Sequence, residues 1–288
     1  MAEHSEGYKT QSVLLGAHAE GCYSKALGRG SHAEGIETIA EHAAHSEGQK
    51  TYAKGVFAHA EGYETVAELD AAHAEGNKTK ATGQYSHAEG SGTKATAAAS
   101  HSEGTGTESS QMAAHAEGDT TKALGHASHT EGVNTQAIGH SSHAEGYETK
   151  ATDQGAHSEG NSTLASGVAS HAEGIENTTA SGQGSHAEGR GTKAQGNYSH
   201  SEGNKTEARH TSSHTSGTRT ITGCDSQMVV GKYNKIIDTA VFVVGNGTGD
   251  ADTQRHNAFV VYDDNSIQIG DTKITEEQVK KLLAILDA

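Results

Sequence analysis

A four-residue motif recurs along most of this chain at a spacing of fourteen residues. The motif is His, a small residue, Glu and Gly, and its sixteen copies begin at His4 and end with the copy at His214. Thirteen of the fifteen intervals are fourteen residues, while the step from His32 to His45 is thirteen and the step from His171 to His186 is fifteen. A fixed period indicates a solenoid of equivalent coils. We expect the missing and the extra residue to lie in turns, because a slip within a strand would reverse its faces.

Each repeat contains two segments whose side chains alternate with a period of two. The sequence SHAEG at residues 31–35 represents the first segment, and TKATG at residues 79–83 represents the second. This alternation is typical of short β-strands, and the Gly residues between the segments favour turns. Two strands per coil, stacked coil on coil, predict an all-β parallel β-roll.

The alternation also predicts which side chains face inward. Ser, Ala, Thr and Gly share one side of each strand, and only small groups fit between two sheets joined by such short turns. The outward positions of the second segment vary, as Lys80 and Leu124 illustrate, whereas the outward positions of the first are His and Glu in every copy but the last, which has Ser216 in place of Glu. A face that repeats in every coil is expected to meet something that also repeats, and the simplest partner is a second copy of the chain.

Composition narrows the classes of function. The chain has 37 acidic and 21 basic residues and a formal net charge of −16, which argues against a nucleic-acid partner. Fifteen of the acids are repeat Glu residues, so nearly all of the net charge lies on the His–Glu side. The sequence has no apolar run of the roughly 18 residues that a membrane helix needs, so we expect no membrane insertion.

The repeat resembles the head repeat of trimeric autotransporter adhesins, in which SVAIG-type and SxAxG-type segments alternate every fourteen residues. The likeness covers about residues 1–217, with His in the Val position and Glu in the Ile position of that family. It implies a left-handed parallel β-roll and a homotrimer over residues 1–217. It also implies that the trimer axis is lined by His18, Glu20, His32, Glu34, His59, Glu61, His73, Glu75, His87, Glu89, His115, Glu117, His143, Glu145, His171, Glu173, His186 and Glu188.

The role expected for these side chains is structural. A protonated His beside a Glu forms a charge-assisted hydrogen bond, which would stabilise a buried ladder. If such pairing raises the pKa of His, stability should peak at mildly acidic to neutral pH. The sequence leaves open an alternative in which neutral imidazoles hold a metal, or the axis holds an anion, so no cofactor is required and no metal ligand is assigned. Identical stacked sites offer no distinct pocket or nucleophile, so we expect no catalytic residue and no enzyme activity.

The C-terminal part has a different composition. Residues 218–273 contain most of the Val, Ile and Phe and predict a small β domain. Residues 274–288 predict a short helix that opens with a capping box formed by Thr275 and Gln278. The sequences VGKYN (230–234), FVVGNG (242–247) and RHNAF (255–259) resemble a segment common in tail fibres and baseplate appendages of phages and phage-derived particles, over about residues 224–270.

The two resemblances together imply a trimeric structural and receptor-binding rod of a phage or phage-like tail fibre. Its expected partners are two further copies of itself, a glycan or protein receptor on the host cell surface, and other tail or baseplate proteins. It would be located in a virion tail or phage-like particle and act outside the cell. The alternative is the head of a trimeric adhesin on a bacterial cell surface.

Overall fold

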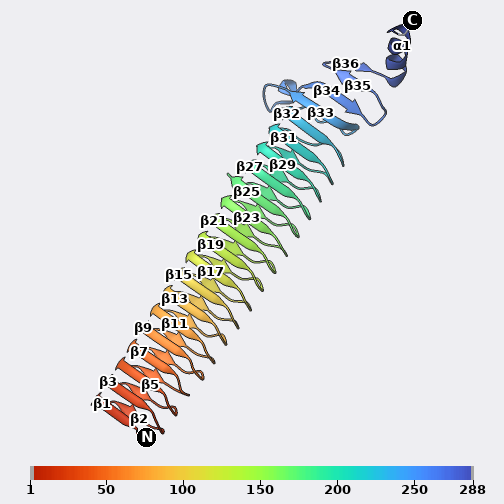
Figure 1. Cartoon of the computed structure of the whole chain (residues 1–288). Helices are drawn as coiled ribbons and strands as arrows, with labels where there is room; N and C mark the ends of the chain where they lie inside the picture. Colours follow the sequence, from red (N-terminus) through yellow and green to blue (C-terminus); the bar gives the residue numbers. More distant parts are fainter. Residues whose placement is uncertain (1–2, 287–288) are drawn as a thin grey trace. The chain divides into compact units, whose positions relative to one another are not determined.

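Each repeat but the last folds into one coil that carries a long and a short β-strand. A computed structural model describes residues 3–286, which divide into two compact units, a first unit up to Glu148 and a second unit from Thr149. The long strand begins at the repeat His, and the short strand follows after a turn. Figure 1 shows the long strands of successive coils lying side by side within each unit, and the short strands likewise. The predicted all-β solenoid is therefore confirmed, and the structure describes one chain.

The strands of the first unit alternate long and short. The long strands are β1 (His4–Tyr8), β3 (His18–Cys22), β5 (His32–Ile36), β7 (His45–Gln49), β9 (His59–Tyr63), β11 (His73–Asn77), β13 (His87–Ser91), β15 (His101–Thr105), β17 (His115–Asp119), β19 (His129–Val133) and β21 (His143–Tyr147). The short strands are β2 (Gln11–Ser12), β4 (Lys25–Ala26), β6 (Ile39–Ala40), β8 (Tyr52–Ala53), β10 (Val66–Ala67), β12 (Lys80–Ala81), β14 (Lys94–Ala95), β16 (Glu108–Ser109), β18 (Lys122–Ala123) and β20 (Gln136–Ala137).

The second unit begins with the same alternation. Its long strands are β23 (His157–Asn161), β25 (His171–Ile175), β27 (His186–Arg190), β29 (His200–Asn204), β31 (His214–Thr218), β32 (Met228–Lys232) and β33 (Ala240–Asn246). Its short strands are β22 (Lys150–Ala151), β24 (Leu164–Ala165), β26 (Thr179–Ala180), β28 (Lys193–Ala194) and β30 (Glu207–Ala208). It ends with a 3₁₀ turn η1 (Asp252–Gln254), strands β34 (Asn257–Tyr262), β35 (Ile267–Ile269) and β36 (Thr272–Ile274), and helix α1 (Glu276–Leu286).

The register between coils places each residue of a repeat on its equivalent in the next. In β13 and β15, which pair in parallel, His87 lies opposite His101 and Glu89 lies opposite Glu103. The short strands keep the same rule, with Ala67 opposite Ala81. This register holds across the irregular intervals too, since His32 still pairs with His45 and His171 with His186.

The missing and the extra residue both lie in turns, as predicted. The shortened repeat loses its residue between Ala40 and His45, where His42 and Ala43 adopt positive φ angles of 42° and 59°. The lengthened repeat gains its residue between strands β25 and β26, where Glu176 and Asn177 have φ angles of 58° and 61°. The strands on either side keep their register because the change in length falls outside them.

The interior of the coils is built from small side chains. In the first unit the inward Ala33 and Ala40 are fully buried, and so are the inward Thr38 and Ser46. Buried Ala residues contact one another from coil to coil and form the apolar part of this core. The prediction that the small side faces inward is confirmed, because the two strands of a coil lie too close for larger groups.

The solenoid course of the second unit continues beyond the last His motif. Strand β31 pairs in parallel with β32, and β32 pairs in parallel with β33, so that His214, Met228 and Phe242 are equivalent at fourteen-residue steps. The composition changes at residue 217, but the backbone keeps the same path for two more strands. The core also changes, since Val229 and Val243 are fully buried where the repeats have Ala.

After β33 the parallel coils give way to an antiparallel meander. Strand β33 pairs with β34, β34 with β35, and β35 with β36, all antiparallel. Buried amide and guanidinium groups hold the turns before it: Asn234 accepts a hydrogen bond from the Ile221 amide at 2.8 Å, and Arg255 donates to the Asn234 carbonyl at 3.1 Å. These residues come from the VGKYN and RHNAF sequences, whose role in this structure is to close the second unit.

Helix α1 starts with the predicted capping box. The Thr275 amide donates to Gln278 Oε1 at 2.8 Å, and the Gln278 amide donates to Thr275 Oγ1 at 3.3 Å. Leu282, Leu283 and Ile285 are each more than half exposed, so this chain leaves them largely uncovered. Positions 287–288 of the predicted helix lie outside the described residues.

Candidate functional site: the His–Glu face

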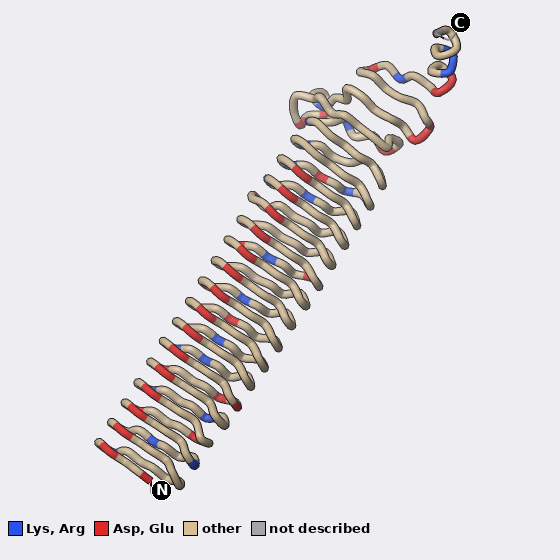
Figure 2. The backbone as a smooth tube through the Cα atoms, viewed as in Figure 1, with Lys and Arg blue, Asp and Glu red and all other residues tan. Residues whose placement is uncertain are grey.

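The outward side of the long strands carries the repeat His and Glu side chains, which we call the His–Glu face. Figure 2 shows the acidic residues recurring at the same place on the long strands of each unit. The side chains are partly exposed: 38% for His32 and 46% for Glu34 in the first unit, and 36% for His186 in the second. The predicted outward direction of these residues is therefore confirmed, whereas their placement on a trimer axis stays a prediction.

The imidazoles of successive coils stack on one another. The rings of His18 and His32 have centroids 4.7 Å apart and planes within 7°, and those of His101 and His115 are 4.6 Å apart and within 9°. The second unit repeats this, with His171 and His186 at 4.7 Å. The spacing is that of neighbouring β-strands, about 4.8 Å, because an in-register parallel roll places each ring directly over its equivalent.

Most repeat Glu carboxylates lie 3.2–3.9 Å from an imidazole nitrogen. In the first unit the contact is within one coil, and the predicted pairs have Nε2–Oε2 distances of 3.9 Å (His18–Glu20), 3.7 Å (His32–Glu34), 3.8 Å (His59–Glu61), 3.7 Å (His73–Glu75), 3.9 Å (His87–Glu89), 3.6 Å (His115–Glu117) and 3.2 Å (His143–Glu145). In the second unit Glu173 instead contacts His186 of the next coil at 3.6 Å, and Glu188 contacts His200 at 3.8 Å.

Several Nε2 atoms of the stack are shielded from solvent without a hydrogen bond. This holds for His32, His73, His101 and His115 in the first unit and for His171 in the second, none of whose Nε2 atoms has a hydrogen-bond partner among residues 3–286. A polar atom withdrawn from water without a partner costs free energy. The face therefore presents a row of nitrogen atoms that a ligand or a second chain could satisfy.

Protonation of several imidazoles in the stack is disfavoured. Burial lowers the pKa of His73, His87, His101 and His115, and the neighbouring imidazole lowers each further, while the nearby Glu residues only partly oppose this. The pKa of His32, His171 and His200 is lowered for the same two reasons. A simple ladder of protonated His paired with Glu would raise these pKa values, so the structure gives the opposite direction. The main reason is burial of the rings, and the adjoining imidazole adds to it.

The Glu residues are stacked like on like as well. Hydrogen bonds that the Glu173 carboxyl shares with Glu188 and then with Glu159 raise its pKa to about 7. At the end of the row, where Ser216 replaces the repeat Glu, the Ser216 hydroxyl lowers the pKa of Glu202 by a hydrogen bond. The Ser in the last copy thus ends the carboxylate row with a neutral donor.

The predicted site residues are part of a larger set of equivalent His–Glu pairs. The pairs that were not singled out, such as His101 with Glu103 and His45 with Glu47, take equivalent places at 3.6 Å and 3.8 Å. Sequence reasoning missed the ring stacking, and it missed a second stack away from the face, between His126 and His140 at 4.8 Å. Their spacing of fourteen residues was the available signal.

The chemistry available to this face is that of neutral imidazoles beside carboxylates. Such a set can accept hydrogen bonds, pair with a second chain or ligate a metal ion. Within residues 3–286, helix α1 included, the structure contains no helix with the length and apolar character required to cross a bilayer. No protein-family model matches the chain, and no curated protein matches it.

Proposed function

We propose that this chain is a non-enzymatic structural and binding protein that forms a homotrimer through its His–Glu face, as the shaft of a phage tail fibre or phage-like particle. One observation carries the proposal. The outward residues of the long strands are His and Glu in every coil from His4 to Glu202, whereas those of the short strands change from Lys25 to Ile39 to Tyr52. Solvent imposes no such repetition, but a partner that repeats at the same spacing does.

A second copy of the chain meets this requirement most simply. Its coils have the same spacing, so one set of contacts is reproduced in every layer, and closed symmetry limits growth to a defined oligomer. The Nε2 atoms of His73 and His115 lack hydrogen-bond partners in the described chain, and we expect groups from neighbouring copies to supply them. The resemblance to trimeric adhesin heads supports three copies rather than two.

The small interior favours the same conclusion. The first unit buries mainly Ala, Ser and Thr, such as Ala74, Thr79 and Ser102, each of which removes little apolar surface from water. A solenoid with such a core gains stability by burying an outer face against other chains. The proposed partners beyond the trimer are a receptor on the host cell surface and other tail or baseplate proteins.

The mass of the full chain in solution tests the assembly. Light scattering coupled to size exclusion, in the presence of a chelator, should give three times the chain mass of 29.7 kDa. The double variant Glu103→Lys/Glu117→Lys should reduce the trimer fraction, while Lys80→Glu/Lys94→Glu, which alters the outward side of the short strands, should not. A wild-type chain that is monomeric at micromolar concentration would contradict the proposal.

The location and the receptor need separate experiments. An antibody against the chain should label purified tail-like particles; labelling of the bacterial surface instead would favour the adhesin alternative. Fluorescently labelled protein should bind host cells, and periodate treatment of the cells would remove binding if the receptor is a glycan, whereas protease treatment would remove it if the receptor is a protein.

A further inference from the structure

The geometry points to a further property of the His–Glu face: successive coils form sites for a divalent transition-metal ion of the zinc type, each made of two imidazole nitrogens and one carboxylate oxygen from a single chain. The inference goes beyond the proposed function and does not depend on association, because every ligand comes from one chain. It also differs from a site on a three-fold axis, which would take one imidazole from each of three copies.

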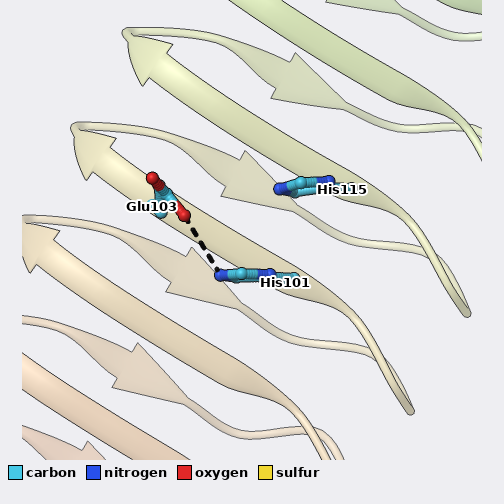
Figure 3. A group of neighbouring side chains, drawn as sticks. All are labelled: His101, Glu103 and His115. Carbon is cyan, nitrogen blue, oxygen red and sulfur yellow. Dashed lines mark ion pairs between the residues drawn. The ribbon is translucent and has the colours of Figure 1, made fainter.

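The site is clearest between strands β15 and β17. His101, Glu103 and His115 each offer one ligand atom, and these three atoms all lie within 4.8 Å of one another. Figure 3 shows the Glu103 carboxylate and the two imidazoles on the same side of the neighbouring strands. The same arrangement recurs in His115, Glu117 and His129, and in the second unit in His171, Glu173 and His186. Two nitrogen ligands and one carboxylate oxygen form a set typical of zinc.

The imidazole nitrogens are available to act as ligands. A metal binds the neutral imidazole, and burial together with the adjoining ring keeps the pKa of His101 and His115 low. The Nε2 atoms of both residues make no hydrogen bond with any residue of the described chain. Neither Nε2 atom is therefore already engaged by a hydrogen bond.

The carboxylate can reach either imidazole. In the first unit Glu103 lies 3.6 Å from His101 of its own coil, and in the second unit Glu173 lies 3.6 Å from His186 of the following coil. The repeat Glu therefore contacts the imidazole of its own coil in one repeat and the imidazole of the following coil in another. A carboxylate between two stacked imidazoles can complete a site with both.

Binding requires a modest rearrangement. Ligands 2.0–2.2 Å from a tetrahedral ion are about 3.4 Å apart, so the three atoms must draw closer than their present spacing. The rings of His101 and His115 lie almost parallel and must tilt towards one another, which their positions allow because 35% and 36% of their side-chain surfaces are exposed. The bound cation would also reduce the repulsion between stacked carboxylates.

The arrangement fixes the number of ions. Neighbouring triads share an imidazole, as His115 belongs to the triads of both Glu103 and Glu117. One Nε2 atom ligates one ion, so adjacent triads cannot both be filled. A run of consecutive triads should therefore saturate at one ion for every two coils of the run.

The test uses the full chain, stripped of metal with a chelator that is then removed. Calorimetric titration with ZnCl₂ should show saturation at one ion per two coils, and CoCl₂ should produce the visible absorption bands of four-coordinate Co²⁺, while CaCl₂ should do neither. A variant with Gln at all fifteen repeat Glu positions should lose at least about tenfold in apparent affinity, since even outer ligand partners contribute that much.

A second variant distinguishes shared from independent sites. It carries Gln at alternate repeat Glu positions: Glu20, Glu47, Glu75, Glu103, Glu131, Glu159 and Glu188. The remaining triads do not share imidazoles, so this variant should bind the same number of ions as the natural chain. His126→Gln, which alters a stacked His off the face, should leave binding unchanged. The inference is overturned by absent Zn²⁺ binding, by loss of half of the ions in the alternate variant, or by unchanged affinity in the fifteen-fold variant. The mass measurement above is independent of each of these results.

Discussion

At the scale of single residues, the interior hydroxyls show how a change of one atom alters the stability of a coil. Where the repeat has Ser after His, the buried Ser and Thr can pair, as Ser46 and Thr51 do at 2.7 Å. Where it has Ala, as at Ala60, the Oγ1 atom of Thr65 is buried without a partner in the described chain. A buried hydroxyl without a hydrogen bond is unfavourable, so the coils differ in stability although their backbones agree.

Substituting Ala60→Ser should therefore stabilise the protein. The new hydroxyl can bond Thr65 Oγ1 as Ser46 bonds Thr51, with an expected gain of about 1 kcal/mol in the free energy of unfolding. The reverse change, Ser46→Ala, should cost a similar amount by leaving Thr51 without that bond. Denaturant unfolding followed by circular dichroism measures both, and a loss of stability in Ala60→Ser would show that the coil has no room for the oxygen.

At the scale of the strand, the repeat Gly allows coils to approach one another. Gly104 in β15 has a φ angle of 106°, and a Cβ atom there would lie 2.1 Å from the Gly118 carbonyl oxygen of the next coil. Two residues later, Gly106 has a φ angle of 63° and its nearest neighbour would be Thr120 Oγ1 at 3.8 Å. Both positions favour Gly, but only the first is also sterically closed.

The two glycines should respond differently to Ala. Gly104→Ala must displace a strand and should cost more than about 3 kcal/mol, or prevent folding of the surrounding coils. Gly106→Ala should lower the free energy of unfolding by only about 1–2 kcal/mol, the cost of a left-handed backbone at a residue with a Cβ atom. Thermal unfolding of both variants makes the comparison, and equal losses would contradict the close approach of the coils.

The stacked imidazoles predict how stability depends on pH. Their pKa values are lowered in the folded chain, as for His73 and His87, so the unfolded chain binds more protons below its ordinary pKa of about 6.5. Stability should be constant with respect to these groups above that pH and fall as the pH drops below it. Glu173, with a pKa raised to about 7, contributes in the opposite direction, but the lowered histidines outnumber it.

Melting temperatures measured from pH 8 to pH 5, in the presence of a chelator, check this. We expect a plateau above about pH 6.5 and a steady decline below it. A maximum near pH 5.5 would indicate instead that His–Glu pairing outweighs burial and the adjoining imidazoles.

At the scale of the molecule, the coil is the unit of construction within each of the two compact units. Each coil of unit 1 pairs only with its neighbours, as β13 does with β11 and β15. Such a solenoid tolerates the loss of a whole coil far better than the loss of part of a coil. The natural intervals of thirteen and fifteen residues show that a coil can also lose or gain one residue when the change lies in a turn.

Deleting one whole coil should leave a folded protein. Removal of residues 87–100 joins Ser86 to His101, restores the motif and should change the melting temperature by only a few degrees. Removal of residues 87–93 joins Ser86 to Lys94, places a short strand where a long one belongs and should abolish cooperative unfolding. Circular dichroism and limited proteolysis distinguish the two, and equal behaviour of both deletions would contradict the coil as the folding unit.

The fourteen-residue period and its alternation were enough to predict the parallel coils, the small interior, the outward His and Glu, and the turns that absorb the irregular repeats. These features depend on which residues share a face, and local sequence decides that. The tertiary structure alone decided what meets what across coils: imidazole on imidazole, carboxylate beside two rings, and a backbone path that continues from β31 into β32 and β33 after the motif has ended. The physical reason is that hydrogen bonds between strands set a spacing of about 4.8 Å between residues fourteen positions apart. This spacing places equivalent imidazoles against one another, where burial and the adjoining ring lower the pKa of residues such as His73 and His101.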